Sequence, residues 1–167
     1  MQEKIFNIQN NSQFEKVALE VFDYQIAHNK IYANYATKLL KGERPCNIYE
    51  IPFLPISFFK SEQVICQKRA VEEIFLSSGT RGVQSKHLIS DISIYEESYI
   101  KSFELFYGDV TQYCILSLLP NYREREASSL IYMVDDLISK SKHEKSNFYL
   151  DNYEEATKTL QKLEDLG

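Results

Sequence analysis

The sequence predicts an α/β fold, with a mixed or parallel sheet flanked by helices, in a single domain of 167 residues. Two observations lead to this class. Segments with apolar residues at helical spacing alternate with short runs that are rich in β-branched and aromatic residues. The chain is also 44% hydrophobic, which is enough to build one core in a domain of this length.

The first predicted element is a long N-terminal helix over about residues 12–41. Its apolar side chains recur at helical spacing, Asn11 or Ser12 can cap its start, and Gly42 ends it. The segment 51–60 then contains two prolines, which remove backbone hydrogen-bond donors. We expect an extended stretch there that leads into one short helical turn.

Two short strands are predicted next, at 64–67 and 72–77, because both segments have β-branched and aromatic content. The second strand runs directly into a loop of small residues. A helix follows this loop, and Asp91 can cap its start while Gly108 ends it. A third strand, 113–119, is predicted to be buried and to stop at the next proline.

Two helices complete the predicted fold. One starts at Ser128 or Ser129 and has apolar residues at positions i, i+3, i+4, i+7 and i+8. The other is amphipathic and covers roughly 153–166. Strands separated by helices of this length imply βα units, so we expect a sheet that is covered by helices.

Composition excludes several classes of function. The formal net charge is −5 and the basic residues are dispersed, so no nucleic-acid partner is expected. No apolar segment approaches the roughly 20 residues of a membrane span, and no apolar signal core follows Met1. We therefore expect a cytoplasmic protein without a transmembrane segment. Cys46, Cys66 and Cys114 have no paired spacing, which predicts neither a disulfide framework nor a thiolate metal site, and no pair of histidines has metal spacing.

The segment 75–87 concentrates hydroxyl groups, two glycines and two cations directly after a predicted strand. Glycines let backbone amides converge on an anion, hydroxyls add donors, and Arg81 or Lys86 can neutralise charge. These residues predict a loop that holds the β- and γ-phosphates of ATP. An ordinary strand-ending turn explains the same composition. The spacing matches neither a Walker loop nor a dinucleotide fingerprint.

A wider pattern resembles one enzyme family. The sequence Ser-Ser-Gly-Thr-Arg-Gly at 77–82 resembles the phosphate-binding motif Ser-Gly-Thr-Thr-Gly of adenylate-forming enzymes, with Arg81 in place of the second threonine. Its continuation, Ser85-x-His87-x3-Asp91-x3-Tyr95, resembles the acyl-protein synthetases (LuxE family). The likeness spans most of the chain and corresponds to the amino-terminal portion of those enzymes, including part of their large N-terminal domain. The other segments that carry it are 52–60, 118–133 and 148–150.

The resemblance implies an activity and its participants. Family members use ATP and Mg²⁺ to activate a fatty or other carboxylic acid as an acyl-adenylate, and then pass the acyl group to a thiol. An acyl-accepting or reductase-like protein is the implied partner. The resemblance places His87 at the acyl-adenylate site, and Arg125 and Ser129 near the substrate, although solvated charges explain Arg125 equally well. The residues predicted to hold ATP are Ser77, Ser78, Gly79, Thr80, Arg81, Gly82, Ser85 and Lys86.

The same comparison limits what this chain is expected to do alone. The family supplies base recognition, an acidic ligand and a mobile lysine-bearing segment in its later half, so we expect little or no turnover and self-association through the surface left by that half. Two alternatives stay open. One is a non-catalytic or degenerate module that docks a partner subunit. The other is an ATP-independent acyltransferase in surface-polysaccharide or lipid assembly.

Overall fold

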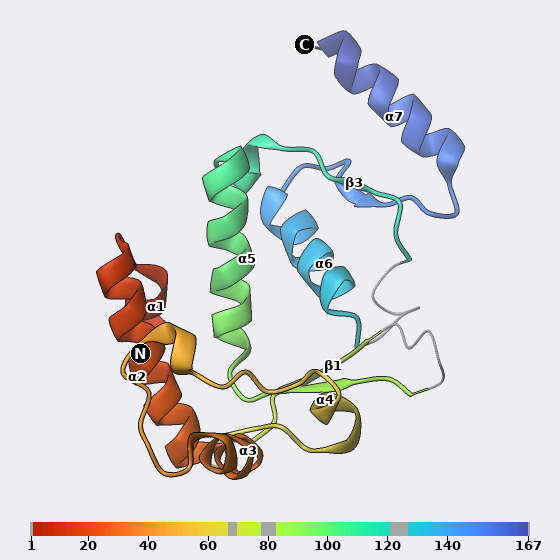
Figure 1. Cartoon of the computed structure of the whole chain (residues 1–167). Coiled ribbons are helices and arrows are strands. Elements are labelled where there is room, and N and C mark those ends of the chain that lie inside the picture. Colours follow the sequence, from red (N-terminus) through yellow and green to blue (C-terminus); the bar gives the residue numbers. More distant parts are fainter. Residues whose placement is uncertain (1, 67–69, 78–82, 121–126, 167) are drawn as a thin grey trace. The chain divides into compact units, whose positions relative to one another are not determined.

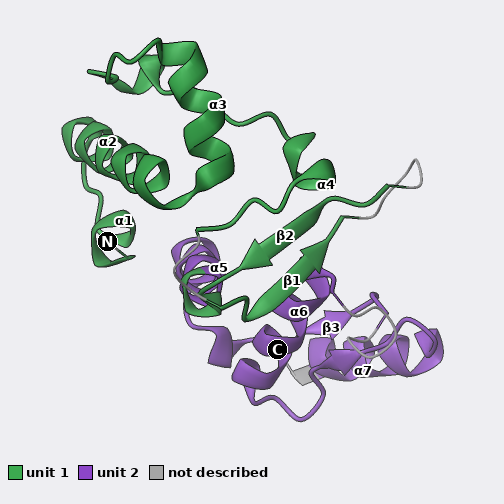
Figure 2. Cartoon of the chain, turned by 90° about the horizontal axis from the view of Figure 1, so that it is seen from below, with its two compact units in different colours: residues 1–94 green, residues 95–167 purple. Residues whose placement is uncertain are grey.

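The computed structural model describes residues 2–66, 70–77, 83–120 and 127–166, and these form a mixed α/β chain that is rich in helix (Figure 1). The chain divides into two compact units, Met1–Ile94 and Tyr95–Gly167, which Figure 2 shows in different colours. The mixed α/β class predicted from the sequence is confirmed.

The N-terminal part of unit 1 is helical. Its three helices are α1 (Gln2–Phe6), α2 (Asn11–His28) and α3 (Lys30–Leu40). The single long helix predicted over 12–41 is therefore wrong. At Asn29 the backbone is extended, with φ −109° and ψ 99°, and the side chain accepts a hydrogen bond from the amide of Tyr32 at 3.1 Å. The amide of Asn29 also donates to the carbonyl of Gln25 at 2.8 Å. One buried asparagine thus ends α2 and caps α3.

The ends of these helices follow ordinary capping chemistry. Asn10 caps α2, one residue before the predicted caps, because its side chain accepts a hydrogen bond from the amide of Gln13 at 3.0 Å. Beyond α3, Gly42 has φ 91°, a left-handed conformation that favours glycine. A short 3-10 helix, η1 (Ile48–Glu50), and the helix α4 (Phe58–Ser61) follow. Helix α4 confirms the helical turn predicted for the proline-containing segment.

The core of unit 1 forms where α2 and α3 meet. Phe22, Tyr32 and Ala36 are buried, and Ala36 has no exposed surface. The rings of Phe22 and Tyr32 meet edge to face with centroids 6.2 Å apart, a geometry that aromatic pairs favour. Four partly buried residues pack against this cluster, namely Ile26, Leu40, Ile51 and Leu54.

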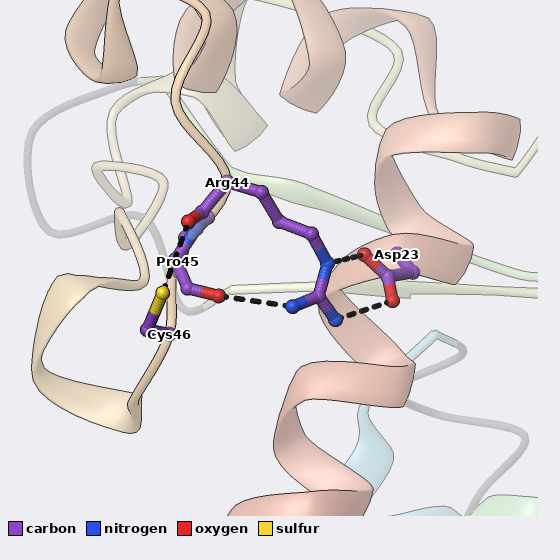
Figure 3. Close-up of polar contacts among 4 residues, drawn as sticks. All are labelled: Asp23, Arg44, Pro45 and Cys46. Atoms are coloured by element: carbon purple, nitrogen blue, oxygen red, sulfur yellow. Dashed lines mark hydrogen bonds and ion pairs between the residues drawn. The ribbon is translucent and has the colours of Figure 1, made fainter.

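A bidentate ion pair ties the chain after α3 back to α2. Arg44 donates to both carboxylate oxygens of Asp23, at 3.0 and 2.7 Å, and also to the carbonyl of Pro45 at 3.1 Å (Figure 3). The guanidinium of Arg44 lowers the pKa of Asp23 below its ordinary value. Pro45 is fully buried beside this pair.

The strands of unit 1 form an antiparallel hairpin. It consists of β1 (Glu73–Leu76) and β2 (Lys86–Ile89), with Phe75 opposite His87 and Leu76 opposite Lys86. The strand predicted at 72–77 is confirmed as β1, whereas no strand forms in the described part of the segment predicted at 64–67. Strand β2 was not predicted, and its antiparallel pairing with β1 makes a hairpin and not a βα unit.

Helix α5 (Ile92–Tyr107) begins in unit 1 and continues into unit 2. The amide of Ile92 donates to the carboxylate of Glu72 at 2.9 Å, which satisfies one of the free donors at the helix start. At the other end, Gly108 has φ 82°, and its amide donates to the carbonyl of Glu104 at 2.9 Å. The helix predicted between Asp91 and Gly108 is confirmed.

Unit 2 contains the one parallel strand pair of the described chain. Its elements after α5 are η2 (Val110–Gln112), β3 (Leu116–Ser117), α6 (Ser129–Ser141), β4 (Asn147–Phe148) and α7 (Tyr153–Leu166). Strands β3 and β4 pair in parallel with α6 between them in the sequence, as a βα unit predicts. Of the strand predicted over 113–119, only the two residues of β3 form a strand. Both predicted C-terminal helices are confirmed. Ser128 caps α6 by accepting a hydrogen bond from Ile131.

Tyrosine hydroxyls join α5 to α6. Tyr99 donates to the carboxylate of Asp136 at 2.6 Å, and Tyr132 donates to Glu96 at 2.6 Å. Burial, followed by the neighbouring Asp136 carboxylate, raises the pKa of Tyr99 far above its ordinary value. Both effects favour the neutral hydroxyl, so this tyrosine acts as a hydrogen-bond donor between the helices.

Among the residues that the structure describes, none of the helices combines the length and the apolar character needed to cross a lipid bilayer.

Candidate functional site

Four of the residues predicted to hold ATP or substrate lie together at the loop end of the hairpin: Ser77, Ser85, Lys86 and His87. Ser129 lies elsewhere, as the first residue of α6 in unit 2, where its carbonyl accepts a hydrogen bond from the hydroxyl of Tyr95. The remaining predicted residues lie outside the described part of the chain. These are Ser78, Gly79, Thr80, Arg81, Gly82 and Arg125.

Three hydrogen bonds close the base of the loop. The amide of Ser77 donates to the carbonyl of Ser85 at 3.0 Å, and the amide of Ser85 donates to the hydroxyl oxygen of Ser77 at 2.9 Å. The side-chain amide of Gln84 donates to the carbonyl of Ser77 at 2.9 Å. These bonds hold the two ends of the loop together. A hydroxyl that accepts one bond can still donate another, so Ser77 keeps a proton for a ligand.

The two faces of the hairpin differ in burial, because successive side chains on a strand point to opposite faces. Phe75 is buried on the same face as the half-buried His87, which lies opposite it. Ser85, two residues before His87 on the same strand, belongs to this inner face and is also buried. Lys86 is exposed on the outer face. Lys86 and His87 can therefore contact the same ligand only at the edge or at the loop end of the hairpin.

An aromatic side chain covers one face of His87. The ring of Phe59, in α4, stacks on the imidazole with centroids 4.6 Å apart and an angle of 17° between the planes. Stacking fixes the plane of the imidazole and leaves its two nitrogens at the ring edge, where a hydrogen-bond partner can reach them. Sequence reasoning did not assign a role to Phe59. Its only signal was its position in the segment 52–60, which carries part of the family resemblance.

The described residues provide neither an activated thiol nor a cluster of metal-binding side chains. Burial raises the pKa of the Cys66 and Cys114 thiols, so both are poorer nucleophiles than a free cysteine. Cys46 is exposed and contacts the carbonyl of Arg44 at 3.8 Å (Figure 3). Within the described ranges, no three His, Cys, Asp or Glu side chains are grouped so that they could hold a metal ion.

No family model, no curated protein and no solved structure matches the chain. The similarity to the acyl-protein synthetases thus stays a prediction, based on the motifs quoted above.

Proposed function

We propose that the β1–β2 hairpin binds the phosphates of ATP and that His87 contacts the carboxylic acid being activated, so that the chain contributes to the formation of an acyl-adenylate. The observation that supports this proposal most directly is the closed base of the loop. Its hydrogen bonds hold Ser77 and Ser85 together, and the segment between them begins with the sequence Ser-Gly-Thr-Arg-Gly. His87 follows Ser85 by two residues.

The proposed reaction is an in-line displacement. A carboxylate oxygen attacks the α-phosphorus of ATP, the bond from that phosphorus to the bridging oxygen breaks, and pyrophosphate leaves with the bonding electrons. The products are acyl-AMP and pyrophosphate, and a thiol of another protein later displaces AMP. Positioned donors accelerate such a step, because charge on the phosphoryl oxygens changes as the bonds exchange. The Ser77 hydroxyl and a ring N–H of His87 are donors on the inner face, and Lys86 adds positive charge at the edge.

Mg²⁺, which the family resemblance implies, finds no suitable group of side chains in the described residues. We therefore derive no step through it. The thiol acceptor is likewise assigned to a partner protein, since burial disfavours the thiolate form of Cys66 and Cys114.

Calorimetric titration of the chain with ATP and Mg²⁺ tests the binding step. We expect saturable binding that is lost in Gly79→Val and weakened roughly fivefold in Lys86→Met, as about 1 kcal/mol from an exposed charge predicts. Lys101→Met is the matched control, because Lys101 is also exposed but lies in α5 and pairs with Glu97 at 2.9 Å. A flat titration of the unmodified chain would contradict the proposal and favour the non-catalytic binding module.

Exchange of labelled pyrophosphate into ATP tests the chemical step separately. We expect any exchange to need an added carboxylic acid, such as myristate, and to fall in His87→Gln. Acid-dependent exchange that keeps its rate in His87→Gln would remove His87 from the site. Transfer of an acyl group without consumption of ATP would favour the acyltransferase alternative.

A further inference from the structure

Unit 2 contains a cavity of about 490 Å³ between α7 and the turn that precedes β4. The turn contributes residues 143–145. Helix α7 contributes residues 155, 158, 159 and 162, which share one face because they are spaced i, i+3, i+4 and i+7. The volume lies within the range of small-molecule sites, roughly 300–1,000 Å³. Neither the family resemblance nor the proposed ATP site assigns a role to this cavity.

Positive charge predominates on the walls. Lys145, Lys158 and Lys162 line the cavity. Lys145 and Lys158 form long ion pairs with Glu144 and Glu154, at 3.8 Å and 3.9 Å, and the side chains of both pairs are largely exposed to solvent. Lys162 has no ion pair within the described residues. This concentration of ammonium groups stands out in a chain whose net charge is −5.

Two acidic side chains also line the cavity, Glu144 and Glu155. Glu155 is bound to Asn152, which caps the start of α7: its carboxylate accepts from the Asn152 side-chain amide at 2.6 Å, and its own backbone amide donates to the Asn152 side-chain oxygen at 3.2 Å. One of the two carboxylates is thereby engaged at the start of α7. The three lysines and two glutamates leave the walls with a formal charge of 3 − 2 = +1.

Two uncharged donors also line the cavity. Thr159 has only 7% of its surface exposed, and its hydroxyl has no hydrogen-bond partner among the described residues. No buried side-chain oxygen of the described residues lacks a partner, so this hydroxyl is open to the cavity, where it can donate to a ligand or to water. In His143, Nδ1 accepts a hydrogen bond from the amide of Lys145 at 3.1 Å. The proton of the neutral imidazole therefore lies on Nε2, which makes that nitrogen a donor.

We propose that this cavity binds the phosphate group of a small organic anion. Three ammonium groups, one hydroxyl and one imidazole N–H offer more donors than the two oxygens of a carboxylate accept, and a phosphate carries more charge and more acceptor oxygens. Lysine serves as a point-charge ligand for phosphate. Leu163, also on the wall, gives the organic part of the ligand an apolar surface.

The test is an NMR titration of the whole ¹⁵N-labelled chain with inorganic phosphate at constant ionic strength. We expect saturable amide shifts at residues 143–145 and 155–163. The dissociation constant should rise about fivefold or more in Lys162→Met, from the loss of one charge-assisted hydrogen bond. Thr159→Val keeps the side-chain volume but removes the hydroxyl, and should weaken binding roughly threefold. The matched control Lys101→Met should leave the constant unchanged.

Three results would overturn the proposal. The first is an unchanged dissociation constant in Lys162→Met, with the helical circular dichroism of the variant intact. The second is an equal response to acetate at the same concentration, which would mean that the cavity attracts any anion. The third is a set of shifts confined to Ser77 and residues 85–87. That last pattern would place phosphate at the hairpin and support the ATP proposal, so the two proposals fail separately.

Discussion

Removing the hydroxyl of Tyr99 should destabilise unit 2 by about 2 kcal/mol. Tyr99 is 6% exposed and donates to the carboxylate of Asp136 at 2.6 Å. A hydrogen bond to a charged group contributes about 1.5–3 kcal/mol. We take the lower part of this range because the Asp136 side chain is 24% exposed and keeps its contact with Lys140 at 2.5 Å. In a chain of this length, Tyr99→Phe should lower Tm by roughly 4–8 °C.

A double-mutant cycle isolates the interaction free energy between Tyr99 and Asp136. Urea unfolding of Tyr99→Phe, Asp136→Ala and the double variant should give a coupling free energy of about 1–2 kcal/mol. Tyr153→Phe is the control, because Tyr153 is 59% exposed and its hydroxyl has no partner among the described residues. Its free energy of unfolding should change by no more than about 0.5 kcal/mol. A coupling energy near zero, or equal losses in Tyr99→Phe and Tyr153→Phe, would refute the reasoning.

Four further predictions concern the remaining features. Asn29→Ala removes the cap of α3 and should cost about 1–2 kcal/mol in urea unfolding; an unchanged midpoint would contradict the capping role. Ala36→Leu should cost about 1–3 kcal/mol by overpacking a residue with no exposed surface, measured in the same assay. In Arg44→Met, an NMR titration should show the pKa of Asp23 moving up toward its ordinary value. The stability difference from the unmodified chain should exist above the pKa of Asp23 in the unfolded chain and disappear as pH falls through the lowered folded value, because only the ionised carboxylate pairs with Arg44. The expected self-association should appear in sedimentation velocity and weaken in Phe106→Lys, since this side chain is 76% exposed.

The helices α5 and α6, which the sequence predicted correctly, have both a periodic apolar face and a residue that marks one end of the helix. Helix α5 ends at Gly108, and α6 starts after Ser128. The failure at Asn29 has a local reason. Apolar spacing continues through this position, and neither proline nor glycine marks it, so only the competition of the asparagine side chain for the Tyr32 amide breaks the helix.

The strands were harder to predict because their partners are distant in sequence. Strand β4 has two residues and exists only through pairing with β3, some thirty residues earlier, since Leu116 lies opposite Asn147. Strand β2 carries Lys86 and His87 in its first half, so it lacks the β-branched and aromatic content that indicated β1. Strand propensity alone therefore does not distinguish β2 or β4 from a loop.

The site residues likewise divide into those that local sequence indicates and those that only contacts between distant segments reveal. The sequence drew attention to Ser77, Ser85 and His87 through local composition, and the hairpin does bring them together. The stacking of Phe59 on His87 joins residues 28 positions apart and has no local signal. The lysines of α7 resemble an ordinary solvated helix face in the sequence, and only the adjacent turn reveals that two of them line a cavity.

Along the strands of the hairpin, side chains alternate between the inner and the outer face, and this alternation determines where the chain tolerates insertions and deletions. Hydrogen bonds between Ser77 and Ser85 fix both ends of the loop, so the segment between them can change length at a small entropic cost, about 0.6 kcal/mol for a doubling. Deleting one residue within β2 is a different event. Because Ser85 is held at the loop, loss of Lys86 or His87 would shift the rest of the strand by one position and place Leu88 opposite the buried Phe75 in place of His87. Length variation among natural or engineered forms of this hairpin should accordingly be confined to the loop.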